Sequence, residues 1–148
     1  MKNKENLLKE LNIYLANLNI LNVKLHNYHW NIQGRGFFEL HSKFEELYNK
    51  ASEDLDQVAE RMLILGSRPA ASMKDYLQLS TMEEKSSEGI SSLDAVKALK
   101  EDYNLMYNHS MEIINLAEES GDPVTADMMT DFAADYEKTL WMIRAYLG

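Results

Sequence analysis

The hydrophobic residues of this chain recur at alternating steps of three and four, which is the spacing of one buried face of an α-helix. Four stretches carry the pattern, at about 4–32, 38–65, 92–120 and 123–147. The second stretch has the longest uninterrupted stripe, made of Leu40, Phe44, Leu47, Ala51, Leu55, Val58, Met62 and Leu65. With only six Gly and two Pro, the chain holds few of the residues that punctuate strands and turns. The pattern predicts an all-α protein of four long helices.

Short turns separate the first helix from the second and the third from the fourth. The run 33–36, Gln-Gly-Arg-Gly, holds two glycines that favour a turn over a continuing helix. In the run 121–123, Gly-Asp-Pro, Asp122 is expected to cap the fourth helix and Pro123 to take its first position. Each of these two turns therefore predicts an antiparallel helical hairpin.

A longer connection joins the second helix to the third. The run 66–69, Gly-Ser-Arg-Pro, closes the second helix, and Ser91 is the expected N-cap of the third. Within the connection, residues 75–79 are expected to form a short helix. Four helices with two short turns and one long crossover predict a four-helix bundle, as one domain over residues 1–148.

Charge and composition narrow the chemistry. Fifteen Lys and Arg against 24 Asp and Glu leave a formal net charge of −9, which argues against a protein that coats DNA through a basic surface. Because the chain has no cysteine, a metal site must be built from His, Asp and Glu. The start of the chain lacks the unbroken apolar stretch of a signal peptide or membrane span, so we expect a cytoplasmic protein.

The second helix carries two pairs of possible metal ligands beside its apolar stripe. His41 and Glu45 are four residues apart, and so are Asp56 and Glu60, which places each pair on neighbouring turns of one face. At 100° per residue, both pairs point away from the core stripe. They are therefore expected to face solvent or another subunit.

One copy of this helix cannot bring both pairs to one metal ion. Glu45 and Asp56 are eleven residues apart, about 16 Å along a helix, whereas each ligand must reach within about 2 Å of the ion. A two-fold axis near position 50 sets His41 and Glu45 of one subunit opposite Asp56 and Glu60 of the other. His29 can complete the histidine half, because the hairpin returns the chain beside the end of the first helix. The prediction is two equivalent sites for each pair of subunits.

Imidazole and carboxylate ligands together suit Fe(II), with Zn(II) or Mn(II) as chemically reasonable competitors. The alternative for His41 and Glu45 is ordinary pairing on a helix surface. Two acidic residues four apart repel each other, so Asp56 and Glu60 have more need of a cation. His26 and His109 are expected to have ordinary, partly buried roles.

Several runs of the sequence, taken together, resemble the Dps family, the DNA-binding proteins from starved cells, also called Dps-like miniferritins. These runs are 25–41, 44–48, 56–61, 121–128 and 140–148, and the likeness covers nearly the whole chain. The resemblance implies a ferritin-like four-helix bundle that assembles from two-fold dimers into a hollow dodecamer. It also implies a ferroxidase that oxidises Fe(II), preferentially with hydrogen peroxide, and stores ferric mineral inside the shell, protecting the cell against oxidative stress.

The resemblance also implies roles for particular residues. The ferroxidase ligands of the family match His29 and His41 from one subunit with Asp56 and Glu60 from its mate. A further carboxylate of the family site, usually Asp, matches Glu45, whose side chain is one methylene longer. Trp30 matches a neighbour of the iron site, although a role in packing is equally in keeping with its position.

By the same resemblance, the start of the fourth helix lines pores through which iron enters. Asp127 is the best match, with Glu118 and Asp122 as further candidates. A ring of carboxylates at a narrow opening concentrates divalent cations.

Two alternative functions are considered. The first is a nucleoid protein that coats DNA and has little ferroxidase role. Family members that bind DNA use Lys-rich tails, whereas the basic residues at the start of this chain are only Lys2 and Lys4, followed by the acidic Glu5. DNA binding is therefore expected to be weak or absent. The second is a structural bundle that holds zinc or manganese without redox turnover.

Overall fold

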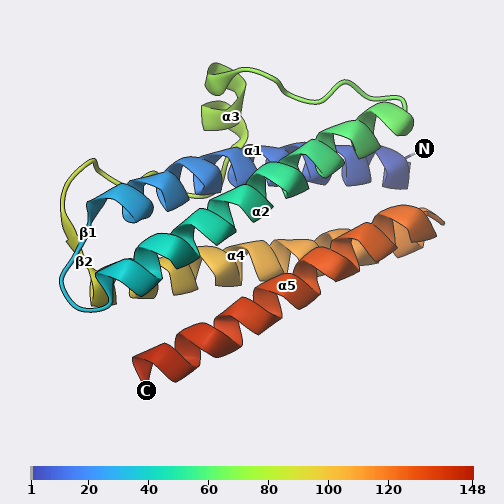
Figure 1. Cartoon of the computed structure of the whole chain (residues 1–148). Coiled ribbons are helices and arrows are strands. Elements are labelled where there is room, and N and C mark those ends of the chain that lie inside the picture. Colours follow the sequence, from blue (N-terminus) through green and yellow to red (C-terminus); the bar gives the residue numbers. More distant parts are fainter. Residues whose placement is uncertain (1) are drawn as a thin grey trace.

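The computed structural model describes residues 2–148, which form five helices and two very short strands. In chain order these are α1 (Lys2–Asn31), β1 (Ile32–Gln33), α2 (Phe37–Ile64), α3 (Met73–Leu79), β2 (Ile90–Ser91), α4 (Ser92–Glu119) and α5 (Pro123–Leu147). The four long helices lie where the hydrophobic pattern predicts them. Figure 1 shows α1 beside α2 and α4 beside α5, and α3, in the crossover from α2 to α4, lies against α1 on the side away from α5. The predicted all-α bundle with a long crossover and a short helix is confirmed.

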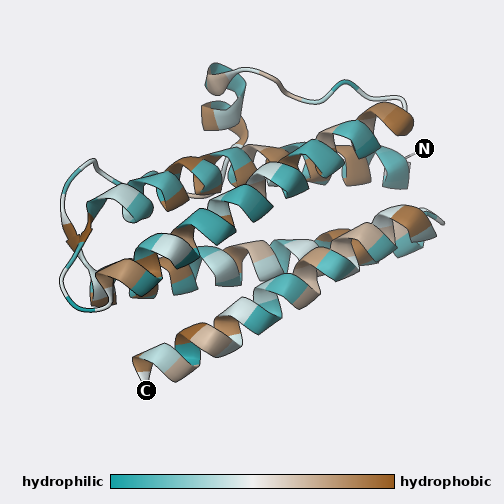
Figure 2. Cartoon of the chain, in the orientation of Figure 1, coloured by the Kyte–Doolittle hydropathy of each residue, from teal (hydrophilic) through white to brown (hydrophobic). Residues whose placement is uncertain are grey.

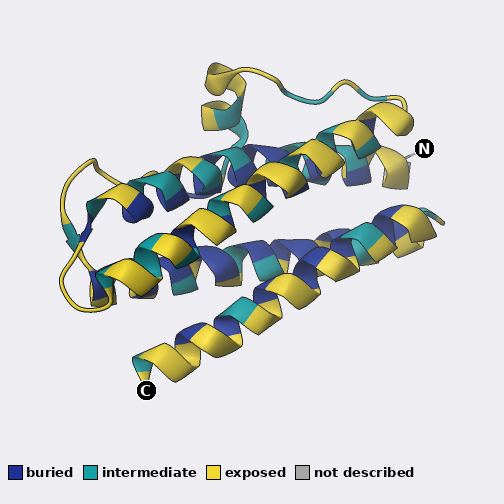
Figure 3. Cartoon of the chain, viewed as in Figure 1, coloured by how far each residue is buried: buried dark blue, intermediate teal, exposed yellow. Residues whose placement is uncertain are grey.

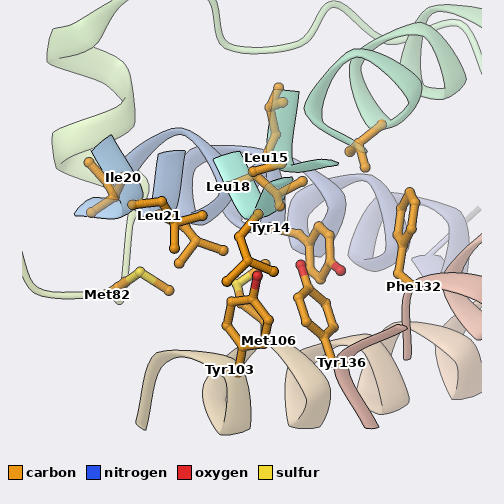
Figure 4. Packing of buried hydrophobic residues seen from close by; sticks show 14 of the residues in the cluster. Tyr14, Leu15, Leu18, Ile20, Leu21, Met82, Tyr103, Met106, Phe132 and Tyr136 are labelled. Atoms are coloured by element: carbon orange, nitrogen blue, oxygen red, sulfur yellow. The ribbon is translucent and has the colours of Figure 1, made fainter. Parts of the chain in front are cut away.

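The apolar stripes of the four long helices meet in one core, and exposed residues lie on the outer faces (Figure 3). Figure 4 shows Tyr14 of α1 among Tyr103 of α4 and Phe132 and Tyr136 of α5. The Tyr14 hydroxyl lies 2.9 Å from Ser110 Oγ, and its ring stacks on Phe132 with centroids 6.1 Å apart. Burial raises the pKa of Tyr14 well above its usual value, so the phenol stays neutral.

Polar and apolar residues alternate around each long helix (Figure 2), as amphipathic helices require. None of the helices within residues 2–148 combines the length and the mean hydropathy needed to cross a bilayer.

The two hairpin turns use glycine in the left-handed region. Gly36, at the N-cap of α2, has φ 76°, and Gly121, after α4, has φ 71°. Asp122 caps α5 as predicted, because its side chain accepts a hydrogen bond from the Thr125 N–H at 3.0 Å. Arg61 of α2 donates to the same carboxylate at 2.9 Å, which ties the α4–α5 hairpin to α2.

Polar side chains of α1 hold the crossover against the bundle. Asn17 is fully buried, and its Oδ1 accepts from the backbone N–H groups of Thr81 at 2.8 Å and Met82 at 3.1 Å. Lys24 Nζ donates to the Glu83 carbonyl at 2.7 Å and pairs with buried Asp102 of α4 at 2.9 Å. These contacts satisfy loop backbone groups that would otherwise be buried without partners.

The end of the crossover returns beside the first turn. β2 pairs in parallel with β1, with Ile32 opposite Ile90 and Gln33 opposite Ser91. The sequence pattern does not predict this pairing, because two residues are too few to show the alternation of a strand. The pairing anchors the start of α4 at the end of the bundle that holds His29.

Candidate metal centre

His29 and His41 face each other across the α1–α2 turn. Their rings stack with centroids 3.7 Å apart and planes 13° from parallel. His29 lies in the last turn of α1 and His41 in the second turn of α2. The reversal of the chain at residues 34–36 therefore brings together two imidazoles that are twelve positions apart.

Each of these histidines is oriented by the backbone of the other. His29 Nδ1 lies 2.6 Å from the carbonyl oxygen of His41, and His41 Nδ1 lies 2.7 Å from the carbonyl oxygen of His29. A carbonyl oxygen only accepts, so each Nδ1 is the donor, and in a neutral ring Nε2 then carries the free lone pair. The His29 carbonyl is available because the last carbonyls of a helix lack partners within it.

Aromatic neighbours hold the two rings in place. Phe37 stacks on His41 with centroids 5.2 Å apart, and Tyr48 meets the His29 ring edge-on at 5.3 Å. His29 is only 6% exposed, so its ring has little freedom to turn. Sequence reasoning did not single out Phe37 and Tyr48 for this role. Helical spacing could have indicated this role, because Phe37 lies four residues before His41 and Tyr48 lies seven after it, on the same face of the helix.

His26 and Trp30 extend this aromatic cluster. His26 stacks on Tyr48 at 3.8 Å, and its Nδ1 lies 2.7 Å from the Asn22 carbonyl oxygen. The half-buried position agrees with the role expected for His26. Trp30 lies 5.5 Å from the His26 ring and is 67% exposed. Its indole therefore borders the site with most of its surface outside the chain's own core.

Glu45 adds a carboxylate beside the imidazoles. Its Oε1 lies 3.9 Å from His29 Nε2, the nitrogen left free by the backbone contacts. The Glu45 side chain is exposed, so the carboxylate can move without disturbing the core. One chain thus gathers His29, His41 and Glu45 at one place.

The acidic pair of α2 lies elsewhere. Asp56 and Glu60 are exposed, and α2 continues without a break from Phe37 to Ile64. At 1.5 Å per residue, Asp56 is about 16 Å beyond Glu45 along the helix. The single chain therefore brings together three of the five predicted ligands and leaves the other two apart.

The three predicted pore residues have different surroundings. Glu118 and Asp127 are exposed near the α4–α5 turn. Asp122 is the cap of α5. Burial alone would raise the pKa of its carboxyl, but the hydrogen bonds from Thr125 and the charge of Arg61 lower it by a larger amount, so the pKa lies below the usual value. The structure therefore supports the capping role of Asp122.

Comparison with known proteins places this bundle in a family. Residues 8–148 match the model of the ferritin-like domain. The chain is 38% identical over 138 residues to the DNA protection during starvation protein 2 of Bacillus anthracis, covering 93% of this chain and 94% of that protein.

Two solved structures are also similar. The crystal structure of Dps from Staphylococcus aureus has a TM-score of 0.93 and 37% identity, covering 97% of this chain and 96% of that one. A Dps protein of Vibrio cholerae O1, described as a member of a broad superfamily of ferritin-like diiron-carboxylate proteins, has a TM-score of 0.94 and 35% identity, covering 99% of this chain and 92% of that one.

The four-helix bundle and the match over residues 8–148 define a ferritin-like protein. Within that class, the Bacillus anthracis protein and these two solved structures are 35–38% identical to the chain, and both structures are of Dps proteins. The chain belongs to the Dps family.

Proposed function

We propose that this chain is the subunit of a ferroxidase that oxidises Fe(II) with hydrogen peroxide and stores the ferric product in a hollow dodecamer. Membership of a ferritin-like family supports iron storage in general. The observation that carries the proposal is the reciprocal pair of His29 and His41. Both Nδ1 atoms are bonded to backbone carbonyls, and both Nε2 atoms are left for a metal ion.

The remaining ligands come from a second copy of the chain. His29, His41 and Glu45 of one subunit face Asp56 and Glu60 of its two-fold mate, which makes two equivalent sites in each dimer. The side chains between these groups suit a helix partner: Tyr48 and Ala59 are half-buried, and Leu63 is 56% exposed. The exposed Trp30 is expected to pack in the same interface.

The chemistry needs an iron pair and an acidic interior. Two Fe(II) ions each give up one electron, and one hydrogen peroxide takes both electrons and two protons to form two waters. Imidazole and carboxylate ligands suit Fe(II), and Zn(II) or Mn(II) would compete for the same atoms. Asp127 and Glu118 are proposed to draw Fe(II) toward the entry pores. Consuming Fe(II) and peroxide together in the cytoplasm protects the cell against oxidative stress.

Removal of either half of the site tests the proposal. The double variants His29→Ala/His41→Ala and Asp56→Asn/Glu60→Gln should each form shells of normal size and oxidise Fe(II) at least about tenfold more slowly. Particle mass follows from light scattering, and oxidation from the ferric absorbance after peroxide is added. Glu53→Gln, an exposed change on the same helix, is the matched control and should oxidise iron at the normal rate.

Co-expression of the two double variants tests the sharing of ligands between subunits. In a mixed dimer one site loses both halves and the other keeps both, so random pairing leaves about a quarter of the sites intact. Activity should return to about a quarter of the wild-type value. If the mixed shells are as inactive as either parent, the ligands do not come from two chains.

The names of the relatives also fit protection of DNA, so DNA binding is tested separately. The net charge of −9 opposes binding to phosphates. In a gel-shift experiment, the shell should leave duplex DNA unretarded at physiological salt. Retardation there would favour the DNA-coating function.

A further inference from the structure

A second group of metal-binding side chains lies far from His29 and His41. Glu10 of α1 meets His109 and Glu112 of α4, and one ligand atom from each lies within 4.8 Å of the other two. Glu10 precedes His29 by 19 positions on α1, about 28 Å along the helix. The group is therefore separate from the proposed ferroxidase centre.

His109 is the fixed member of this group. Only 8% of the residue is exposed, and its ring packs against Tyr14 with centroids 5.4 Å apart. Its Nε2 lies 2.9 Å from Glu10 Oε1. A buried imidazole nitrogen is thus directed at a carboxylate on the neighbouring helix. The sequence gives no sign of this contact, because the two residues are 99 positions apart, and His109 is therefore expected there to have an ordinary role.

The charges around His109 favour a cation. Glu112 is exposed one helical turn after His109, and it brings a second carboxylate to the same place. Among residues 3–148, no Lys or Arg forms an ion pair with Glu10 or Glu112. A cavity of about 400 Å³ adjoins the three side chains, and its lining adds the oxygens of Thr81 and Asn108 but no basic residue.

We propose that Glu10, His109 and Glu112 bind a divalent transition-metal ion that bridges α1 and α4. One imidazole nitrogen and two carboxylate oxygens form a donor set that suits Zn(II), Mn(II) or Fe(II), with water in the remaining positions. The ion takes the place of the hydrogen bond between Nε2 and Oε1. Glu112 closes on it by a change of side-chain rotamer, which its exposure permits. This binding does not depend on iron oxidation at the other site.

Zn(II) binding to the intact protein tests the proposal. Equilibrium dialysis against a series of free Zn(II) concentrations should show one fewer ion per chain for Glu112→Ala than for wild type, or an affinity weaker by about tenfold or more. Glu112 is exposed and alanine favours a helix, so this variant should fold normally. Glu137→Ala removes the same charge from an exposed position on α5 and should bind as wild type does.

Two further measurements separate this site from the ferroxidase centre. Glu112→Ala should oxidise Fe(II) at the wild-type rate. Co(II) bound to the His109→Gln variant should absorb less visible light than Co(II) bound to the wild type, because one imidazole ligand is lost. If Glu112→Ala and wild type bind equal numbers of Zn(II) ions with equal affinity, Glu10 and His109 are an ion pair only, and the proposal is wrong.

Discussion

Asp54 of α2 should destabilise the protein at neutral pH, although it forms an ion pair. The residue is 3% exposed and pairs with Lys50 one turn earlier, and Lys50 also reaches Asp135 of α5 at 3.3 Å. Burial raises the pKa of Asp54, the hydrogen bond and charge of Lys50 lower it, and burial prevails, so the pKa is about 6. Replacing Asp54 with Asn removes the charge and keeps the size of the side chain.

The magnitude follows from proton linkage. A rise from 3.8 to about 6 corresponds to about 3 kcal/mol. Because the folded state binds this proton more tightly, the contribution to the free energy of unfolding is full below about pH 4 and is lost as the pH rises through about 6. This figure already includes the attraction of Lys50, because the pKa of about 6 is the net result of burial and of that ion pair. The expected gain for Asp54→Asn at neutral pH is therefore about 3 kcal/mol.

Thermal unfolding between about pH 4 and pH 8 measures this gain. For a chain of this size, about 3 kcal/mol corresponds to a Tm increase of roughly 6–12 °C. The difference in Tm between Asp54→Asn and wild type should be absent at the acidic end and should grow through about pH 6. Glu53→Gln, at the neighbouring exposed position, should show no such trend. A gain that is constant with pH, or that shrinks as the pH rises, would refute the reasoning.

Two predictions concern the turns. Asp122→Ala should lower the free energy of unfolding by about 2 kcal/mol, because α5 loses its cap and Arg61 loses its partner. Because the pKa of Asp122 is lowered, this loss should be seen by calorimetry above about pH 4 and should fade as the pH falls below it, while Asp122→Asn should keep part of the cap. Gly36→Ala should cost about 1 kcal/mol, since φ is 76° and the added Cβ would meet only ordinary contacts. Gly121→Ala, with φ 71°, should cost the same, and an unchanged Tm for both variants would contradict the assignment of left-handed strain.

The sequence alone determined the features that depend on neighbours along the chain. Apolar residues that recur at steps of three and four located the four long helices. The predicted start of the crossover helix, at position 75, lies two residues after the start of α3 at Met73. Asp122 was recognised as a cap because capping joins residues three positions apart. The distance between Glu45 and Asp56 was also predictable, because a helix has a fixed rise per residue.

Only the tertiary structure decided the contacts between elements. No local pattern predicted that His29 and His41 would each donate to the carbonyl of the other, or that Glu10 would meet His109. The same holds for Asn17, a polar residue on the buried face of α1 that binds the crossover backbone. The physical reason is that periodicity reports which face of a helix is buried, whereas the rotation and register of packed helices set which side chains meet.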